Sequence, residues 1–448
     1  MRSPRRQFLN YASWAAACAA IGPAALPLGA AGGDYKALLV LYLNGGNDGN
    51  NVLVPTDGAY SDYESSRGVL ALPRSSLLSL PAPAAGHTFG LHPSLAPLMP
   101  LYNSGRLGLL SNVGPLIEPS TAEQVINRSV KVPSFLGSHS DQTAIVQGWM
   151  PEVDNSGWAG RALERLDTSL RNPLSAVTTD SHRTLVLGRS SPVTFMPTNG
   201  MRWWGQADLL SPERQSTQYL LNMAKWQFSN DYEAEYRRTL GASLDDSTRL
   251  TRALVSARAP TADFGSDHLG NMTRSLASVL PVFREQGLRR QVFLMSWGGF
   301  DTHAGQRGTG PNTQDTQLRR LAEVLAAFDR TNVENGLDQQ VVTLVMSEFG
   351  RTLRTGSGSG SEHAWGNHWM LMGGPVVGRT VHGVFPRLIL GGPDDMDTGK
   401  NGRLVPTMSS DQVGATLMRW MGLSPNDFPD VFPYLKNFRS PTLPLLYA

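Results

Sequence analysis

Residues that can bind a metal ion stand just beyond the ends of three apolar runs in this chain. These residues are Asp48, the pair Asp301 and His303, and Glu348. Each one alone could belong to an ordinary polar turn or to a solvated surface. The carboxyl ends of parallel strands meet at one edge of a sheet, where α/β proteins bind their ligands. Three such segments therefore predict one common site.

A fourth group of candidate ligands, His363 and His368, follows a Gly/Ser-rich stretch. On a helix, a spacing of five residues would turn these two side chains about 140° apart. They can converge only from a loop, which Gly366 between them permits. Asp301 and His303 are two residues apart, so an extended backbone would point both side chains the same way.

Carboxylate and imidazole groups without sulfur suit Zn, Mn or Fe in a site that activates water or binds phosphate oxygens. Six such ligands exceed what one tetrahedral ion needs and are about what a two-metal clamp requires. We therefore expect one or two divalent metal ions, with Zn or Mn favoured. The candidate ligands are Asp48, Asp301, His303, Glu348, His363 and His368.

The segment from Ser138 to Gln142 (SHSDQ) has two interpretations. It could be a helix N-cap whose serine side chain binds the first turn. Alternatively, Ser138 could be a hydroxyl nucleophile at a helix N-terminus, where backbone N–H groups favour an anion. Ser138 and His139 from this segment, with Arg351 to steady a developing anion, are the candidate catalytic residues.

The elements that would position these groups alternate between strands and helices. Such alternation is typical of an α/β fold with a mostly parallel central sheet and helices on both faces. The expected strands are 35–43, 106–113, 184–187, 291–297, 340–346 and 368–372. The expected helices are 95–104, 217–240, 272–287, 316–333 and 409–421, and the charged, periodic stretch at about 212–290 is interpreted as a helical insertion.

Composition excludes several classes of protein. The 448 residues include 39 Lys and Arg, 37 Asp and Glu, and one Cys. A single Cys excludes a disulfide framework, a thiolate zinc finger and an iron–sulfur cluster built by this chain alone. The balanced charge gives nucleic acid no bulk electrostatic reason to bind.

The N-terminal 33 residues have the features of an export signal. Arg5-Arg6 and Phe8-Leu9 form a twin-arginine pattern, and an Ala-rich apolar stretch follows. Gly22-Pro23 interrupts that stretch before it reaches membrane-spanning length, so no stable membrane span is expected after cleavage. We expect the twin-arginine translocase as an export partner and a periplasmic or secreted location. Cleavage would remove three basic residues and the Cys, which leaves a single domain, 34–448, with 36 basic and 37 acidic residues.

Several longer motifs carry a resemblance to a known family. They are LYLNGGNDGNNVLVP, LHPSLAPLMPLYNSGRLGLLSNVG, SHSDQ, GGFDTHAGQ, MSEFGRT, HAWGNHWMLMGG and RLVPTMSSDQVGATLMRWMGL. In this order they resemble the bacterial family catalogued as domain of unknown function 1501. That family is similar to a remote branch of the alkaline phosphatase and sulfatase superfamily. The resemblance implies an alkaline-phosphatase-like α/β fold that cleaves phosphate or sulfate esters with one or two metal ions.

The resemblance also implies roles for individual residues. Asp48 resembles the metal carboxylate of the first strand, and Asp301 with His303 resembles a later ligand pair. Glu348 stands where the superfamily has an Asp followed by a His, and His363 or His368 would be the closing imidazole. Two departures weaken this transfer: Phe349 follows Glu348, and neither a Cys-x-Pro-x-Arg nor an Asp-Ser-Ala nucleophile motif is present.

Two functions remain open at this point. The first is an exported, metal-dependent hydrolase of a phosphate or sulfate ester, with a small molecule or polysaccharide as the anionic substrate. The second is a non-catalytic, polysaccharide-associated envelope protein on a degenerate hydrolase scaffold. In that case tryptophans such as Trp203, Trp204 and Trp365 could stack on sugars. Convergence of the candidate ligands in one pocket would favour the first.

Overall fold

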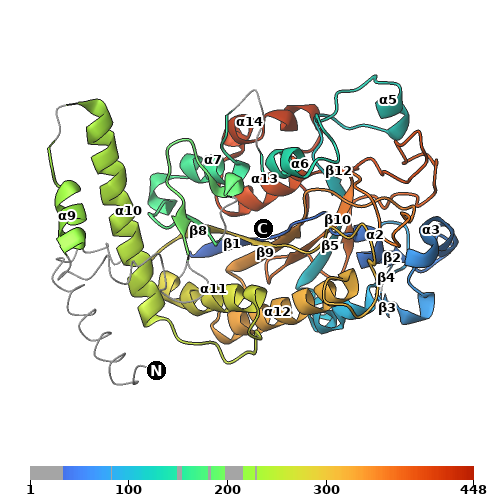
Figure 1. Ribbon diagram of the computed structural model, residues 1–448, viewed down its shortest axis with the longest axis horizontal. Coiled ribbons are helices and arrows are strands. Elements are labelled where there is room, and N and C mark those ends of the chain that lie inside the picture. The colour runs from blue at the N-terminus through green and yellow to red at the C-terminus, as the bar shows by residue number, and fades with distance from the viewer. Residues whose placement is uncertain are drawn as a thin grey trace.

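The computed structural model describes residues 34–81, 83–148, 154–179, 183–196, 215–227 and 230–447. The expected export signal and Trp203-Trp204 lie outside these residues. The described part of the chain is a layered α/β structure built around one large sheet (Figure 1).

The large sheet is mostly parallel. Its strands are β1 (Lys36–Leu43), β5 (Leu107–Gly114), β6 (Ala176–Thr178), β7 (Thr194–Phe195), β8 (Arg290–Trp297), β9 (Val341–Met346), β10 (Asn367–Met372), β11 (Val381–His382) and β12 (Met408–Ser409). They follow the order β11-β5-β10-β9-β1-β8-β6-β7, and β12 pairs with β5. In this sheet β10 runs antiparallel to both of its neighbours, and the other pairs are parallel. A smaller antiparallel sheet contains β2 (Leu53–Pro55), β3 (Leu78–Ser79) and β4 (Phe89–Leu91).

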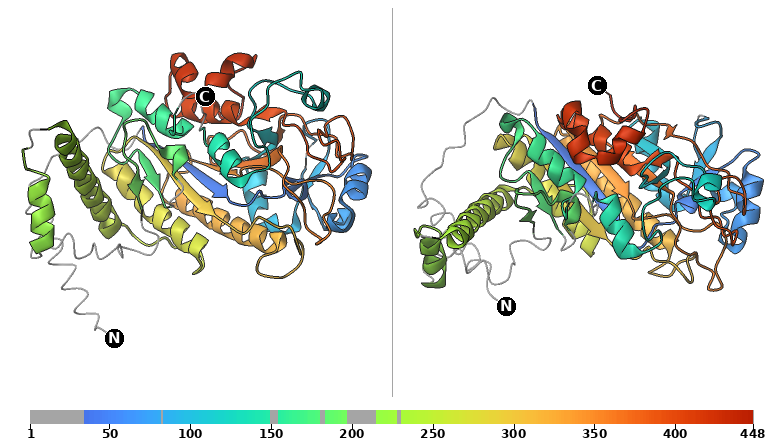
Figure 2. Two further views of the ribbon diagram at one scale, coloured as in Figure 1. Left: turned by 45° about the horizontal axis from the view of Figure 1, so that its top comes forward. Right: turned by 90° about the horizontal axis from the view of Figure 1, so that it is seen from above.

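Helices cover both faces of the large sheet (Figure 2). Leu39 and Leu41 of β1 pack in one apolar core with α11 (His268–Glu285) and α12 (Gln314–Glu334). Leu38 and Val40, which alternate with them, belong to a second core with α7 (Trp158–Arg165), α13 (Ser410–Trp420) and α14 (Phe428–Val431). A strand buried on both faces explains the continuous apolar run of β1. The expected fold class is confirmed.

The remaining helices lie mainly at the rim. They are α2 (Gly49–Val52), α3 (Tyr60–Arg67), α4 (Met99–Asn103), α5 (Ala122–Ile126), α6 (His139–Val146), α9 (Gln215–Met223) and α10 (Asp231–Ser256), with short 3₁₀ turns between several elements. Figure 1 shows α9 and α10 at one end of the molecule, beyond α11. No helix within the described ranges is both long and apolar enough to cross a bilayer.

Two sequence-based expectations were wrong. Residues 184–187 were expected as a strand, but Thr184–Val186 is a 3₁₀ turn. The backbone of residues 184–187 packs directly against Gly157 and Gly160 at α7. A Cβ on either glycine would lie only 2.0 to 2.2 Å from a carbonyl oxygen of this segment, so a larger residue would prevent the contact. The helix expected at 217–240 is two helices, since Asn230 caps a new N-terminus by accepting a hydrogen bond from the amide of Glu233.

One buried carboxyl group ties the stability of the fold to pH. Asp411 lies in the first turn of α13, and its Oδ2 has no hydrogen-bond partner among the described residues. Burial raises the pKa of Asp411 to about 7, against the opposing charge of Arg161. The folded protein therefore binds a proton here that the unfolded chain releases near pH 4.

We predict that the contribution of Asp411 to the free energy of unfolding, taken as the difference between wild type and Asp411→Asn, falls as pH rises from about 4 through about 7. The loss is on the order of 4 kcal/mol, at about 1.4 kcal/mol for each unit of pKa difference. Asp411→Asn should remove this fall, whereas Asp245→Asn, at an exposed site on α10, should keep it. Denaturant unfolding at several pH values measures the effect. Parallel profiles for wild type and Asp411→Asn would show that Asp411 is already ionised in the folded protein.

Candidate active site

The turns that follow β1, β8 and β9 meet at one edge of the sheet. The amide of Gly45 donates a 2.7 Å hydrogen bond to Oε1 of Glu348. Gly45 has a φ of +114°, and a Cβ at this position would lie 2.3 Å from the amide nitrogen of Asp301. Only glycine allows the first turn to approach the second this closely. This contact brings Asp301 and Glu348 into the same site, as the parallel strands predict.

Arg351 connects these turns through its buried side chain. Its side chain is fully buried. It donates hydrogen bonds to the carbonyl oxygens of Gly45, Gly46, Phe300 and Ser361 and forms an ion pair with Asp301. Because its nitrogens are committed to these groups, Arg351 fixes the position of Asp301 and does not face a ligand. It is therefore a positioning residue rather than the expected group that steadies an anion.

Three imidazoles surround the carboxylate of Asp301. Nε2 of His303 and Nε2 of His363 lie 3.0 and 3.2 Å from its Oδ1, and 2.9 Å from each other. Nε2 of His139 lies 3.4 Å from its Oδ2. Ligand atoms of His139, Asp301 and His363 all lie within 4.8 Å of one another. We call these four residues the His–Asp cluster.

Each histidine of the cluster is held in the same way, through its Nδ1. Nδ1 of His139 is 2.9 Å from Oε1 of Glu348, and Nδ1 of His303 is 2.8 Å from Oε2 of Glu362. Nδ1 of His363 is 2.7 Å from the carbonyl oxygen of Gly137. An acceptor at Nδ1 favours the tautomer with its proton there, which leaves the Nε2 lone pair directed at the cluster.

The cluster also shifts the pKa values of its members. Burial disfavours the charge of Asp301, but the hydrogen bond and charge of Arg351, with His363 and His303, outweigh it and hold the pKa at about 2. The hydrogen bond that His139 donates to Glu348 raises the pKa of His139, against partial burial. Burial lowers the pKa of His363. Asp301 is therefore an anion at any physiological pH.

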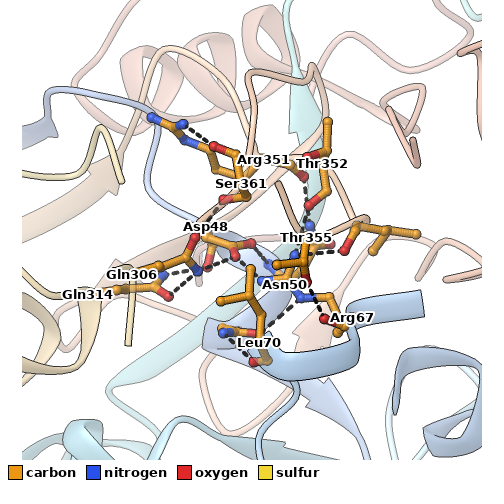
Figure 3. Close-up of polar contacts among 12 residues, drawn as sticks. Asp48, Asn50, Arg67, Leu70, Gln306, Gln314, Arg351, Thr352, Thr355 and Ser361 are labelled. Carbon is orange, nitrogen blue, oxygen red and sulfur yellow. Dashed lines mark hydrogen bonds and ion pairs between the residues drawn. The ribbon is translucent and has the colours of Figure 1, made fainter. Parts of the chain in front are cut away.

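Two of the expected ligands lie elsewhere. Asp48 caps α2 and forms a fully buried ion pair with Arg67 of α3. It also accepts a 2.6 Å hydrogen bond from Nε2 of Gln306 (Figure 3). Nδ1 of His368 accepts a hydrogen bond from the amide of Asn112, and burial lowers its pKa to about 4 despite the charge of Asp48. Asp48 and one ring nitrogen of His368 therefore already bind other groups of the protein.

Ser138 has the capping role that one of the two interpretations gave it. It is the N-cap of α6, and its Oγ accepts a hydrogen bond from the amide of Asp141 and donates one to the Asp141 carboxylate. The cap places His139 in the first turn, with its side chain toward Asp301. Sequence reasoning grouped His139 with the catalytic candidates, and it did not detect Glu362, Arg67 or Gln306. The signal in the sequence for His139 was its position directly after the capping Ser138.

A pocket of about 260 Å³ opens beside the cluster. His303, Glu362 and His363 belong to its wall. The other lining residues are Leu136, Gly137, Ala364, Trp365, Met396 and Arg403. The pocket therefore places a partly apolar space directly against two imidazoles of the cluster.

Fold and site together describe a layered α/β protein with an imidazole–carboxylate cluster at the strand ends. The chain belongs to the family described as Protein of unknown function (DUF1501), which matches residues 35–390. No curated protein matches its sequence.

Several solved structures are similar to this chain, at low identity and with TM-scores below 0.5. One is Ps i-CgsB in complex with k-i-k-neocarrahexaose, at 10% identity and a TM-score of 0.35, covering 90% of this chain and 77% of that one. A second is the lipoteichoic acid synthase LtaP from Listeria monocytogenes, at 8% identity and a TM-score of 0.34, covering 92% and 78%. A third is the C-terminal periplasmic domain of EcEptC from Escherichia coli in complex with Zn, at 11% identity and a TM-score of 0.35, covering 91% and 88%.

We predict that breaking the Asp48–Arg67 pair from either side destabilises the fold. Arg67→Met or Asp48→Asn leaves a buried group without its partner, which costs about 3–5 kcal/mol. The double variant should cost less than the sum of the two. Denaturant unfolding measures each value. Arg238→Met and Glu235→Gln, at an exposed pair on α10, should change stability very little, because solvent screens this pair. If the double variant lost as much stability as the two single variants together, Asp48 and Arg67 would not be energetically coupled, and the prediction would be wrong.

Proposed function

We propose that this chain is a metal-dependent hydrolase of phosphate or sulfate esters, with the metal held by His139, Asp301, His303 and His363. One observation carries the proposal: three histidines with an acceptor at Nδ1 point their Nε2 atoms at one carboxylate. Imidazole and carboxylate ligands with outer oxygen partners are the donor set of catalytic zinc and manganese sites. This set of ligands is smaller than the one that the sequence predicts, since Asp48 and His368 bind protein groups.

A divalent ion in such a site supplies Lewis acidity toward an ester oxygen and lowers the pKa of water. The protein residues around it have separate roles. Arg351 keeps Asp301 ionised and in place, Glu348 orients His139, and Glu362 orients His303. The pocket beside His303 and His363 would bind the organic part of the ester.

We further propose that water rather than Ser138 is the attacking group. The Ser138 hydroxyl is used twice in capping α6, through the amide and the carboxylate of Asp141. The proton of an attacking water could be accepted by a carboxylate at the rim, and Glu362, with a half-exposed side chain beside the pocket, is placed for this.

The alternative, a non-catalytic polysaccharide-associated protein, is supported by the missing nucleophile motifs. Trp365 gives it little support, because this side chain is buried and its indole N–H donates to the carbonyl oxygen of Pro115. Export through the twin-arginine translocase, a periplasmic or secreted location and an anionic ester substrate remain parts of the proposal. They rest on the N-terminal sequence and on the chemistry of the cluster.

We predict that the protein purified after export contains Zn or Mn and that His363→Ala reduces metal affinity sharply. Glu348→Gln, which alters an outer partner of His139, should reduce it about 10- to 100-fold. His382→Ala is the matched control, since His382 lies on β11 and bonds the carbonyl of Val377. Elemental analysis and metal titration give the result, and assays of phosphatase, phosphodiesterase and sulfatase activity with added divalent ions accompany them. A metal-free protein with no response to His363→Ala would contradict the proposal.

We predict that Ser138→Ala retains most of the hydrolytic activity and loses about 1 kcal/mol of stability, the usual value of an N-cap. Turnover with the best ester found in that screen, and thermal unfolding of the same sample, separate the two effects. A loss of activity of a thousandfold or more in a folded variant would instead identify Ser138 as the nucleophile.

A further inference from the structure

The pocket beside the His–Asp cluster combines apolar side chains with one cation. Leu136, Ala364, Trp365 and Met396 contribute apolar atoms, and Arg403 contributes a guanidinium. Its volume of about 260 Å³ equals roughly nine water molecules at ~30 Å³ each. That space accommodates one six-membered ring with its substituents.

The segment that carries Arg403 is held in place by a buried carboxylate. Asp395 accepts 2.9 Å hydrogen bonds from the backbone amides of Gly391, Asp397, Gly402 and Arg403. The amide of Met396 also donates to the carbonyl of Arg403. Arg403 and Met396 are thus presented to the pocket from a fixed loop, as a preorganised binding group requires.

The guanidinium of Arg403 forms one long ion pair, between its Nε and Oδ2 of Asp397 at 3.7 Å. That distance is longer than a hydrogen bond, and the buried Nε has no hydrogen-bond partner in the part of the chain that the structure describes. Asp397 is itself used by the loop, since it accepts from the amide of Gly399 and the side chain of Asn401. The Arg403 side chain is 43% exposed.

We propose that this pocket binds the alcohol part of the ester and that Arg403 binds a second anionic group on it. The substrate would then be an ester of a ring that also bears a carboxylate, sulfate or phosphate. A planar guanidinium binds such groups through paired hydrogen bonds. Glu362 also belongs to the pocket wall, and its carboxylate accepts from Nδ1 of His303. The inference rests on the proposed function, which places the ester group at the cluster.

The test uses two ligands that differ by one carboxylate and cannot be hydrolysed: benzylphosphonate and 4-carboxybenzylphosphonate. Both are titrated calorimetrically into metal-loaded wild type, Arg403→Gln and Arg403→Lys. We expect wild type to bind the carboxylate-bearing ligand about 10-fold more tightly, a typical value for a hydrogen bond to a charged group. Arg403→Gln should lose this preference between the two ligands. Arg403→Lys should keep part of it.

Arg419→Gln, which removes an exposed arginine outside the pocket, controls for the overall charge. Thermal unfolding checks that each variant is folded. Equal binding of the two ligands to wild type, or a preference that survives Arg403→Gln, would overturn this inference and leave the proposed hydrolase site intact. Binding of neither ligand to protein that holds its metal would overturn the proposed ester site as well.

Discussion

The buried guanidinium of Arg351 is the interaction on which the rest of the site depends. Parallel strands bring their carboxyl ends to one edge, but they do not fix the turns beyond. Arg351 bonds carbonyl oxygens from the turns after β1 and β8 and from the loop at Ser361, together with the carboxylate of Asp301. A charge buried this deeply is stable only while these acceptors surround it. The turns are therefore held in one arrangement, and the position of Asp301 follows from it.

The same physical constraint recurs with Asp48 and Arg67. A carboxylate buried at a strand end needs a cation, and either a metal ion or a guanidinium can satisfy it. Here Arg67 comes from α3, and Gln306 adds a hydrogen bond from the loop that also carries His303 (Figure 3). Ser361 in turn donates to Gln306 and accepts from Arg351. One polar network thus connects the strand-end turns to the loops that carry the cluster.

The sequence predicted the layout of the strands, and it selected some of the residues that lie together at their ends. Apolar runs of six to eight residues located β1, β8 and β9 because burial on both faces leaves a continuous pattern. Asp301, His303 and His363 could be selected because their positions follow from strand ends and a loop. The environment of Asp48 could not be predicted in this way, because its partner Arg67 lies in another element. The local spacing of residues around Asp48 contains no information about that contact. The 3₁₀ turn at Thr184–Val186 was missed for a similar reason, since this segment packs against Gly157, the N-cap of α7, and against Gly160 within that helix.

The charges around the cluster explain why its histidines differ. Asp301, Glu348 and Glu362 contribute three carboxylates and Arg351 one guanidinium, so with neutral imidazoles the formal sum is −2. A divalent cation would neutralise that sum. Without one, a proton on His139 relieves part of it, in agreement with the raised pKa that its hydrogen bond to the buried Glu348 produces. Nδ1 of His363 faces the neutral carbonyl of Gly137 instead of a carboxylate, and burial lowers the pKa of His363. A divalent metal ion and a proton on His139 would therefore both relieve the same excess of negative charge around Asp301.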